Sequence, residues 1–500
     1  MFNSVSYNHG SKVSARKQLR KKIFGGYSYV FSRRHQSTIY VVCVKKRTLN
    51  CKGTGKIKNN KFYSLNQHNH KANPMSKIIF DFERALRQKI LKDKFKSLKS
   101  IYEEISLLYP QAAIIKTWVQ MQPRMQYWKK QVQPSKPDSF QDYIDILNDP
   151  QWKFFTNNQD DNKMYVSTLQ CGDMSHVTLY GNPQLLRQIE TSHLLIDATF
   201  TVVPEKPKSH QLFTILALVN DSTIPILWVL MERKTILAYT KILQHLQTVL
   251  APQLKPKIII SDFEVALAVS IKKIYPEADH TGCFFHYSQA LIHKLKEMKL
   301  LTFILQWKNG LIIIKKFLAL ALLPPEKIQD AFEWLTINMP DVIQNHQEFQ
   351  SFIKYYQNQW IRRTNPQVFS VFKKNIRTNN YSEAYNRVIT QELGIHPSIW
   401  EFTYRINQLQ QNALLEYQSL KLGHSIRRSM RNNNMMYEER VKELWNLYEL
   451  DMLTIPQFLA CASYDLRAFS RNKQDDKLEF LNPPNSKIVQ EFDLKNTIFI

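Results

Sequence analysis

Acidic residues are missing from the first 72 positions of this 500-residue chain, and the first one is Asp81. The same stretch contains 16 Lys or Arg residues, so it carries +16 of the formal net charge of +26. A basic excess of this size at one end favours nucleic acid as a partner, with an anionic membrane surface as the weaker alternative.

Cysteine is scarce as well, with five residues in the whole chain. A sparse, odd set of cysteines is unlike a disulfide scaffold and predicts a reducing compartment. No apolar run is long enough to span a bilayer, since the closest, residues 311–323, is short and contains two lysines. The N-terminus lacks the apolar segment of a secretory signal. The basic cluster at 16–22 fits a nuclear import signal or a DNA-binding arm, and we expect a nuclear protein.

Composition shifts divide the chain into five regions. We expect an α+β, multidomain protein with a basic arm at 1–22, a small β-rich module at 23–72, a helical spacer that contributes to DNA binding at 76–185, an α/β domain at 190–400 and a helical C-terminal region with a frayed tail at 401–500. Within the α/β domain, three consecutive strands precede a helix, a strand, a helix and a fifth strand at 279–287. This order predicts a mixed sheet, with the fourth strand beside the first, followed by a helical insertion at about 288–378.

Two cysteines and two histidines in the β-rich module have the spacing of a metal site. Cys43 and Cys51 are separated by seven residues, and His68 and His70 lie two apart, which turns both imidazoles to one face of a strand. Two thiolates and two imidazoles suit tetrahedral Zn²⁺, and a module this small needs such a structural centre. The alternative is two unrelated buried thiols and two surface histidines.

Two apolar strands in the α/β domain are each interrupted by a carboxylate. Asp197 stands inside HLLIDATFTVV, and Asp262 ends IIISD. A lone buried aspartate is costly, and two on neighbouring strands repel each other unless divalent cations such as Mg²⁺ or Mn²⁺ bind them. Glu383, in the first turn of a helix that Asn379 and Asn380 would cap, is the candidate third acid of a two-metal site.

Residues 24–70 resemble the FLYWCH zinc finger. The matching residues are Phe24, Tyr27, Tyr29, Cys43, Cys51, His68 and His70, whereas Val41 stands where the family usually has Trp. The resemblance implies contacts with DNA or protein, and the basic charge favours double-stranded DNA. The residues expected to contact DNA are Arg16, Lys17, Arg20, Lys21, Lys22, Arg33, Arg34, Lys45, Lys46 and Arg47.

Residues 190–400 resemble the catalytic domain of Mutator-like (MULE) transposases, a branch of the RNase H-like DDE superfamily. The similar stretches are LLIDATF, IISDFE, GCFFH and RTNNYSEAYN. The resemblance implies an RNase H-like domain in which Asp197 bridges two Mg²⁺ ions while Asp262 and Glu383 hold one each. It further implies phosphodiester hydrolysis and strand transfer at element ends by an oligomer on DNA. The alternatives are a host-recruited DNA-binding regulator of transcription without cleavage activity, and a nuclease without strand transfer.

Further polar residues lie near these acids in sequence. Cys283 and His286, three apart on an expected strand, would face opposite ways, so packing or the placing of a phosphate by His286 is favoured over a shared metal. Asn380 and Asn386 are candidates for contact with the scissile strand, although capping and helix-surface roles are equally consistent with their positions.

Overall fold

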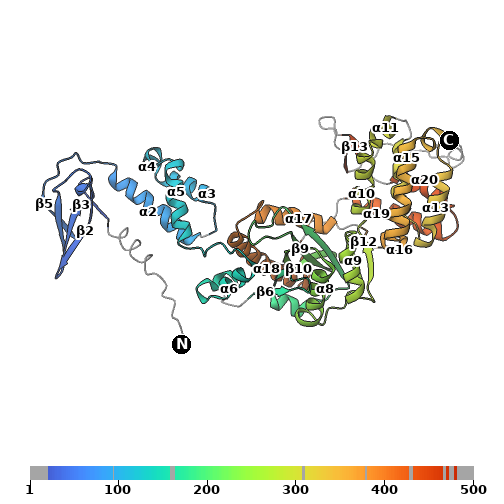
Figure 1. Ribbon diagram of the computed structural model, residues 1–500, viewed down its shortest axis with the longest axis horizontal. Coiled ribbons are helices and arrows are strands. Elements are labelled where there is room, and N and C mark those ends of the chain that lie inside the picture. The colour runs from blue at the N-terminus through green and yellow to red at the C-terminus, as the bar shows by residue number, and fades with distance from the viewer. Residues whose placement is uncertain are drawn as a thin grey trace. The chain divides into compact units, whose positions relative to one another are not determined.

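The computed structural model describes residues 21–93, 95–157, 164–306, 310–374, 376–377, 380–426, 432–465, 469–471 and 478–480. Contacts within the chain divide it into two compact units, Met1–Ser135 and Lys136–Ile500 (Figure 1). The expected basic arm falls almost wholly outside the described residues, and with it Arg16, Lys17 and Arg20. In the described part, no helix combines the length and the apolar character that crossing a membrane requires.

The first unit begins with a five-stranded antiparallel sheet, in agreement with the β-rich module expected from the sequence. The strands follow one another in chain order: β1 (Lys22–Phe24), β2 (Tyr27–His35), β3 (Thr38–Cys43), β4 (Thr54–Lys58) and β5 (Lys61–Asn66). Gly25 and Gly26 make the tight turn from β1 to β2 with positive φ angles, which glycine adopts without steric cost. A short 3₁₀ helix, η1 (Val44–Lys46), follows β3.

Four helices complete the first unit: α2 (Ser76–Lys92), α3 (Leu98–Leu108), α4 (Pro110–Ile115) and α5 (Trp118–Lys130). Apolar residues recur three and four positions apart in these helices, so each helix has one apolar face. Those faces meet in a core that includes Phe82, Leu86, Ile101 and Met125. The helices therefore pack on one another as a small bundle.

The second unit is built on a seven-stranded mixed sheet of order β12-β11-β8-β9-β10-β7-β6. Its strands are β6 (Tyr165–Gln170), β7 (His176–Gly181), β8 (His193–Thr199), β9 (Gln211–Val219), β10 (Ser222–Met231), β11 (Ile258–Ser261) and β12 (Asp279–Gly282). β11 runs parallel to β8 and β12 parallel to β11, while the other pairs are antiparallel. This is the mixed sheet that the sequence predicts, with its fourth strand beside its first.

Two parts of the sheet differ from expectation. β6 and β7 form a hairpin inside the region 76–185, which we expected to be helical. Both strands are rich in Val, Thr and Tyr, the β-branched and aromatic residues that favour strands. The strand expected at 279–287 ends at Gly282, and helix α10 (Phe284–Glu297) begins two residues later. Phe284, Tyr287, Leu291 and Leu295 are buried along α10, which is a helical period.

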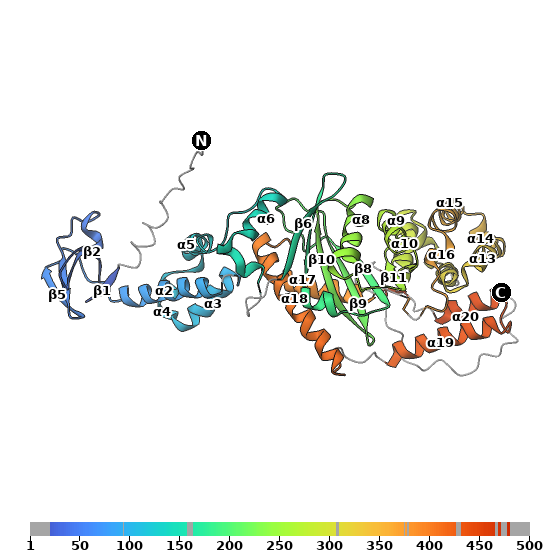
Figure 2. The same ribbon diagram turned by 90° about the horizontal axis from the view of Figure 1, so that it is seen from below.

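Helices cover both faces of the sheet (Figure 2). On one face lie α8 (Ile236–His245), which continues into the π-helical turn η3 (Leu246–Leu250), and α9 (Val265–Ile274); Tyr239 of α8 contacts Phe213. On the other lie α17 (Asn380–Leu393) and α18 (Ile399–Lys421), where the Tyr385 hydroxyl accepts a hydrogen bond from Trp228 Nε1 at 2.8 Å. Smaller elements flank the sheet: α6 (Phe140–Asn148), η2 (Pro150–Phe155) and α7 (Pro183–Gln188).

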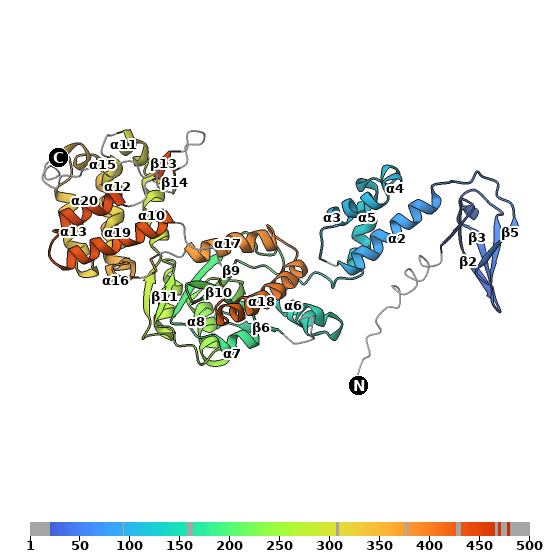
Figure 3. The same ribbon diagram turned by 180° about the vertical axis from the view of Figure 1, so that it is seen from behind.

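A helical region lies between β12 and α17, at the position where we expect the helical insertion. It contains α10, α11 (Leu300–Gln306), α12 (Gly310–Ala319), η4 (Leu320–Leu322), α13 (Pro325–Ile337), α14 (Asp341–Gln344), α15 (Gln347–Tyr356), η5 (Gln357–Thr364) and α16 (Pro366–Phe369). Two helices from near the C-terminus, α19 (Asn432–Glu449) and α20 (Ile455–Asp465), join the same core (Figure 3). Two short antiparallel strands follow, β13 (Phe469–Arg471) and β14 (Leu478–Phe480).

Candidate metal centres

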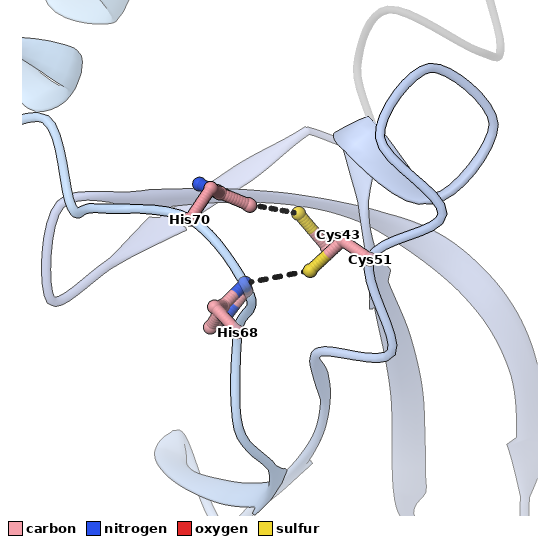
Figure 4. A group of neighbouring side chains, drawn as sticks. All are labelled: Cys43, Cys51, His68 and His70. Atoms are coloured by element: carbon pink, nitrogen blue, oxygen red, sulfur yellow. Dashed lines mark hydrogen bonds between the residues drawn. The ribbon is translucent and has the colours of Figure 1, made fainter.

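The four expected zinc ligands of the first unit come together in space (Figure 4). Cys43 ends β3, Cys51 precedes β4, and both histidines follow β5. Cys43 Sγ lies 3.3 Å from His70 Nε2, and Cys51 Sγ lies 3.3 Å from His68 Nδ1. All four donor atoms are within 4.8 Å of one another. Tetrahedral Zn²⁺ separates a sulfur from a nitrogen ligand by about 3.6 Å, so this Cys₂His₂ group fits a zinc finger.

Neighbouring groups orient the two imidazoles. The Tyr29 hydroxyl is 2.8 Å from His68 Nε2, which leaves Nδ1 directed at Cys51. His70 uses its other nitrogen in the same way, since its Nδ1 lies 3.1 Å from the carbonyl oxygen of Lys71. The ring of Tyr27 stacks on that of His68 at a centroid distance of 3.6 Å. Partners of this kind fix the tautomer and the direction of a metal-binding histidine.

Backbone N–H groups turn toward the two sulfurs. Cys43 Sγ accepts from the N–H of Lys45 at 3.4 Å, and Cys51 Sγ accepts from that of Gly53 at 3.3 Å. Burial raises the pKa of the Cys43 thiol. Burial acts the same way on Cys51, but the N–H groups of Gly53 and Asn69, together with Cys43 and the charge of Lys45, outweigh it and lower the pKa of that thiol. The lowered pKa of Cys51 favours the thiolate form, which is the form that binds a metal.

Gly53 is required by the packing of this centre. A Cβ atom at this position would lie 2.3 Å from Cε1 of the His68 ring, closer than such contacts occur. Any side chain here would therefore displace a zinc-binding imidazole.

Most of the described residues that we expect to contact DNA are exposed to solvent. Lys22, Arg33, Arg34, Lys45, Lys46 and Arg47 are exposed, whereas Lys21 is half-buried. The Arg33 guanidinium lies 5.0 Å from the centre of the Tyr40 ring. Burial lowers the pKa of Lys21; the charge of Glu83 opposes this shift, and those of Arg124 and Lys116 add to it.

In the second unit, the sheet brings Asp197 and Asp262 to neighbouring strands. Asp197 lies on β8, and its residue is 8% exposed. Ile260 of β11 pairs with Leu195 of β8 in parallel register, and the same register continued by two residues sets Asp262 beside Asp197. Asp262 is partly buried and accepts a hydrogen bond from the N–H of Glu264 at 3.2 Å.

Helix α17 brings Glu383 to the same face. Asp197 pairs with Thr214 and Thr214 with Trp228, so Asp197 and Trp228 point to the face that α17 covers. Asn386 donates from Nδ2 to Asp197 Oδ2 at 2.9 Å, and Glu383 lies one turn before it on the helix.

The three carboxylates interact electrostatically. Burial raises the pKa of Asp197 to about 7, and the charge of Asp262 adds to this effect. Burial also raises the pKa of Glu383 to about 7, with a further contribution from Asp197. The buried Oε1 of Glu383 has no hydrogen-bond partner. Carboxylates held together in this way, one with a vacant acceptor, match the donor set that a hard divalent cation prefers.

The oxygens of the three acids do not share one small coordination sphere. Across the described ranges, only the Cys/His group brings three or more possible ligand atoms within 4.8 Å of one another. Two ions about 3.5–4 Å apart need one bridging ligand and one acid on each side, not three oxygens around a single point.

Cys283, His286 and Asn380, which follow or precede the acids in sequence, lie at the starts of two helices. His286 lies in the first turn of α10, not on a strand; burial lowers its pKa, the charge of Asp262 acts in the opposite direction, and its buried Nδ1 has no hydrogen-bond partner. Cys283 is the buried N-cap residue of the same helix. Our inference that these two residues face opposite ways rested on a strand and does not hold. Asn380 begins α17, but its side chain lies outside the described part, as does Asn379.

The sequence analysis did not identify one contact of Asp197 and one acid near Asp262. It proposed a DNA contact for Asn386 but not the hydrogen bond to Asp197, because 189 positions separate the two residues. Glu264 was not among the predicted site residues, yet Tyr239 donates to its Oε2 at 3.1 Å. Burial raises the pKa of Glu264, and Asp262 adds to the shift while Lys234 opposes it.

Comparison with protein-family models matches residues 193–290, which include Asp197 and Asp262, to the MULE transposase domain. This part of the chain is therefore similar to the MULE transposase domain. Residues 13–70, including all four Cys/His ligands, match the FLYWCH zinc finger domain. Comparison with curated proteins finds no match. The MULE domain and the FLYWCH finger together indicate a transposase-like, DNA-binding protein, and Glu383 lies beyond the MULE match.

Proposed function

We propose that this protein is a nuclear DNA transposase that cleaves phosphodiester bonds at element ends and joins them to target DNA. The observation that best supports this proposal is the arrangement of side chains around Asp197. This buried carboxylate interacts with both Asp262 and Glu383, and Asn386 holds one of its oxygens.

An RNase H-like fold is part of the proposal. Its support is the sheet order, in which an antiparallel meander β8-β9-β10 continues on its first strand into the parallel pair β11-β12. The first acid then stands on the first strand and the second at the end of β11. The helical insertion follows, and the third acid returns on a helix against the same face.

Asp197, Asp262 and Glu383 are the residues that would hold two Mg²⁺ or Mn²⁺ ions, Asp197 as the shared ligand and Asp262 and Glu383 as the ligand of one ion each. Such ions, when bound, neutralise charge on the phosphate and provide a nucleophile from water or a 3′-OH. The hydrogen bond from Asn386 favours the ionised form of Asp197 and fixes its orientation. Because Asp197 and Glu383 both have a pKa of about 7, their readiness to bind cations rises with pH through neutrality.

DNA is delivered by the first unit in this proposal. The exposed basic residues of β2 and of the η1 turn provide phosphate contacts, and the zinc centre holds those segments in place. An oligomer on two element ends completes the assembly. Since phosphate contacts release counterions, added salt should weaken binding steeply.

A nicking and joining assay tests the proposal. The full chain is incubated with supercoiled DNA and element-end duplex in Mg²⁺ or Mn²⁺, alongside Asp197→Asn and the control Asp221→Asn, which lies in the exposed β9–β10 turn. We expect nicking and joining with the wild type and the control, and neither with Asp197→Asn. Tight DNA binding without nicking would favour a DNA-binding regulator, and nicking without joining would favour a simple nuclease.

A further inference from the structure

Beyond Glu383, one face of α17 carries uncharged polar residues and one arginine. Glu383, Asn386, Arg387 and Thr390 follow one another at helical spacings of three and four. Beyond Glu383, the residues Asn386, Arg387, Thr390 and Gln391 line a hollow of about 380 Å³. Among the described residues, this lining contains one cation and no acid.

The hollow adjoins the acidic site through one shared residue. Asn386 lines it and at the same time donates to Asp197. Arg387 lies one turn from Glu383, and its charge opposes the burial and the Asp197 charge that raise the pKa of that acid. A group bound at the Asn386 and Arg387 end of the hollow is therefore about one helical turn from Glu383.

Arg387 is the feature of the lining that favours an anion. Arg387 is exposed, so its guanidinium is available for the paired hydrogen bonds that it forms with phosphate oxygens. Gln391 is exposed and adds an amide donor. The Thr390 hydroxyl donates to the carbonyl of Asn386 at 2.8 Å, so it is left as an acceptor. Volumes of small-ligand sites begin at about 300 Å³, so the hollow is large enough for one nucleotide unit.

We propose that this hollow binds the sugar–phosphate backbone of the DNA strand next to the phosphate that is cleaved, with Arg387 on a flanking phosphate. The inference rests on the proposed function, since it assigns a substrate contact to the same site. A flanking contact of this kind fixes the register of the strand without reading its sequence.

The first test compares Arg387→Gln with Arg187→Gln in the full chain. Arg187 is an exposed arginine on α7, and α7 follows β7, which lies three strands away from β8 in the sheet. Nicking kinetics are measured against DNA and salt concentration. We expect Arg387→Gln to raise KM about tenfold and to reduce the salt slope by about one, with Arg187→Gln unchanged and Arg387→Lys intermediate. Equal kinetics for the two glutamine variants would overturn the subsite.

A second test detects the strand without needing cleavage. Gln391→Cys and the exposed control Gln184→Cys are mixed, in Ca²⁺, with DNA that carries a tether on the phosphates flanking the nick site, and the tether ends in a mixed disulfide with a small thiol. The protein thiolate displaces that small thiol by exchange, so the adduct forms without an oxidant. We expect a disulfide adduct specific to Gln391→Cys, above the background of the wild type. Equal adduct formation by both variants would refute the subsite. If the wild type never nicks DNA, the proposed activity fails, but a specific adduct still supports the strand contact.

Discussion

Replacing Asp197 by Asn should stabilise the second unit while abolishing cleavage. Burial raises the pKa of this carboxyl from 3.8 to about 7, so the folded protein ionises it less readily than the unfolded chain does. At pH 8 this difference in pKa lowers the free energy of unfolding by about 4 kcal/mol. An Asn side chain has no charge, so the variant does not incur this loss. An amide retains only one oxygen for the donors Asn386 Nδ2 and Ala198 N–H, and the lost acceptor offsets the gain by about 1–2 kcal/mol.

The sign of the pH dependence follows from the raised pKa. Between the unfolded and folded pKa values Asp197 binds more protons in the folded protein, so its contribution to stability falls as pH rises from about 4 to 7 and is constant above. At pH 5 most of the folded protein has a protonated Asp197, so the loss in unfolding free energy that Asn avoids is only about 2 kcal/mol. The lost hydrogen-bond acceptor cancels this gain. The net gain for Asp197→Asn is therefore about 2–3 kcal/mol at pH 8 and close to zero at pH 5.

Thermal unfolding of the zinc-loaded full chain, in buffer without Mg²⁺ or Mn²⁺, measures this gain. We expect the transition of the second unit to rise by a few degrees at pH 8 and to be unchanged at pH 5. Asp221→Asn is the matched control, since Asp221 is exposed in a turn with positive φ that Asn also adopts. An Asp197→Asn variant no more stable than the wild type at pH 8 would refute the reasoning about the buried carboxylate.

Three further predictions concern the two sites. Gly53→Ala should displace the His68 ring and weaken zinc binding by at least tenfold, measured by competition with a chromophoric chelator; affinity equal to the wild type would contradict the packing argument. Tyr29→Phe should remove the partner of His68 Nε2 and lower zinc affinity about 10–100-fold with the sheet intact by circular dichroism, and no loss would mean that Tyr29 does not orient this ligand. Asn386→Ala should raise the pKa of Asp197 further and move the rising limb of the pH–rate profile for nicking to higher pH, whereas loss of activity with an unshifted profile would indicate a purely structural role.

The sequence was sufficient for the zinc ligands and for the order of the central strands. Ligand spacing identifies Cys43, Cys51, His68 and His70 because thiolate and imidazole chemistry is specific. It did not reveal that Tyr29 holds His68, since that contact joins residues 39 positions apart across the sheet. Apolar runs predicted β8 to β11, and the turn-and-helix order placed β11 beside β8.

The errors occurred where local patterns are ambiguous. The strands β6 and β7 alternate Thr, Ser and Tyr with apolar residues, a pattern too polar to stand out as part of a buried sheet. The apolar run GCFFH reads as a strand, but the residues that follow it bury one helical face, and the helix begins at Phe284. Tertiary packing, which a single sequence does not display, decided both cases.

Titration of the zinc-loaded chain with Mn²⁺, followed by electron paramagnetic resonance at pH 8, tests the central claim most directly. We predict that the wild type binds two Mn²⁺ ions that are magnetically coupled. Each of Asp197→Asn, Asp262→Asn and Glu383→Gln should lose the coupled pair, while Asp221→Asn retains it. A Glu383→Gln variant with an unchanged coupled pair would contradict a site built from these three acids.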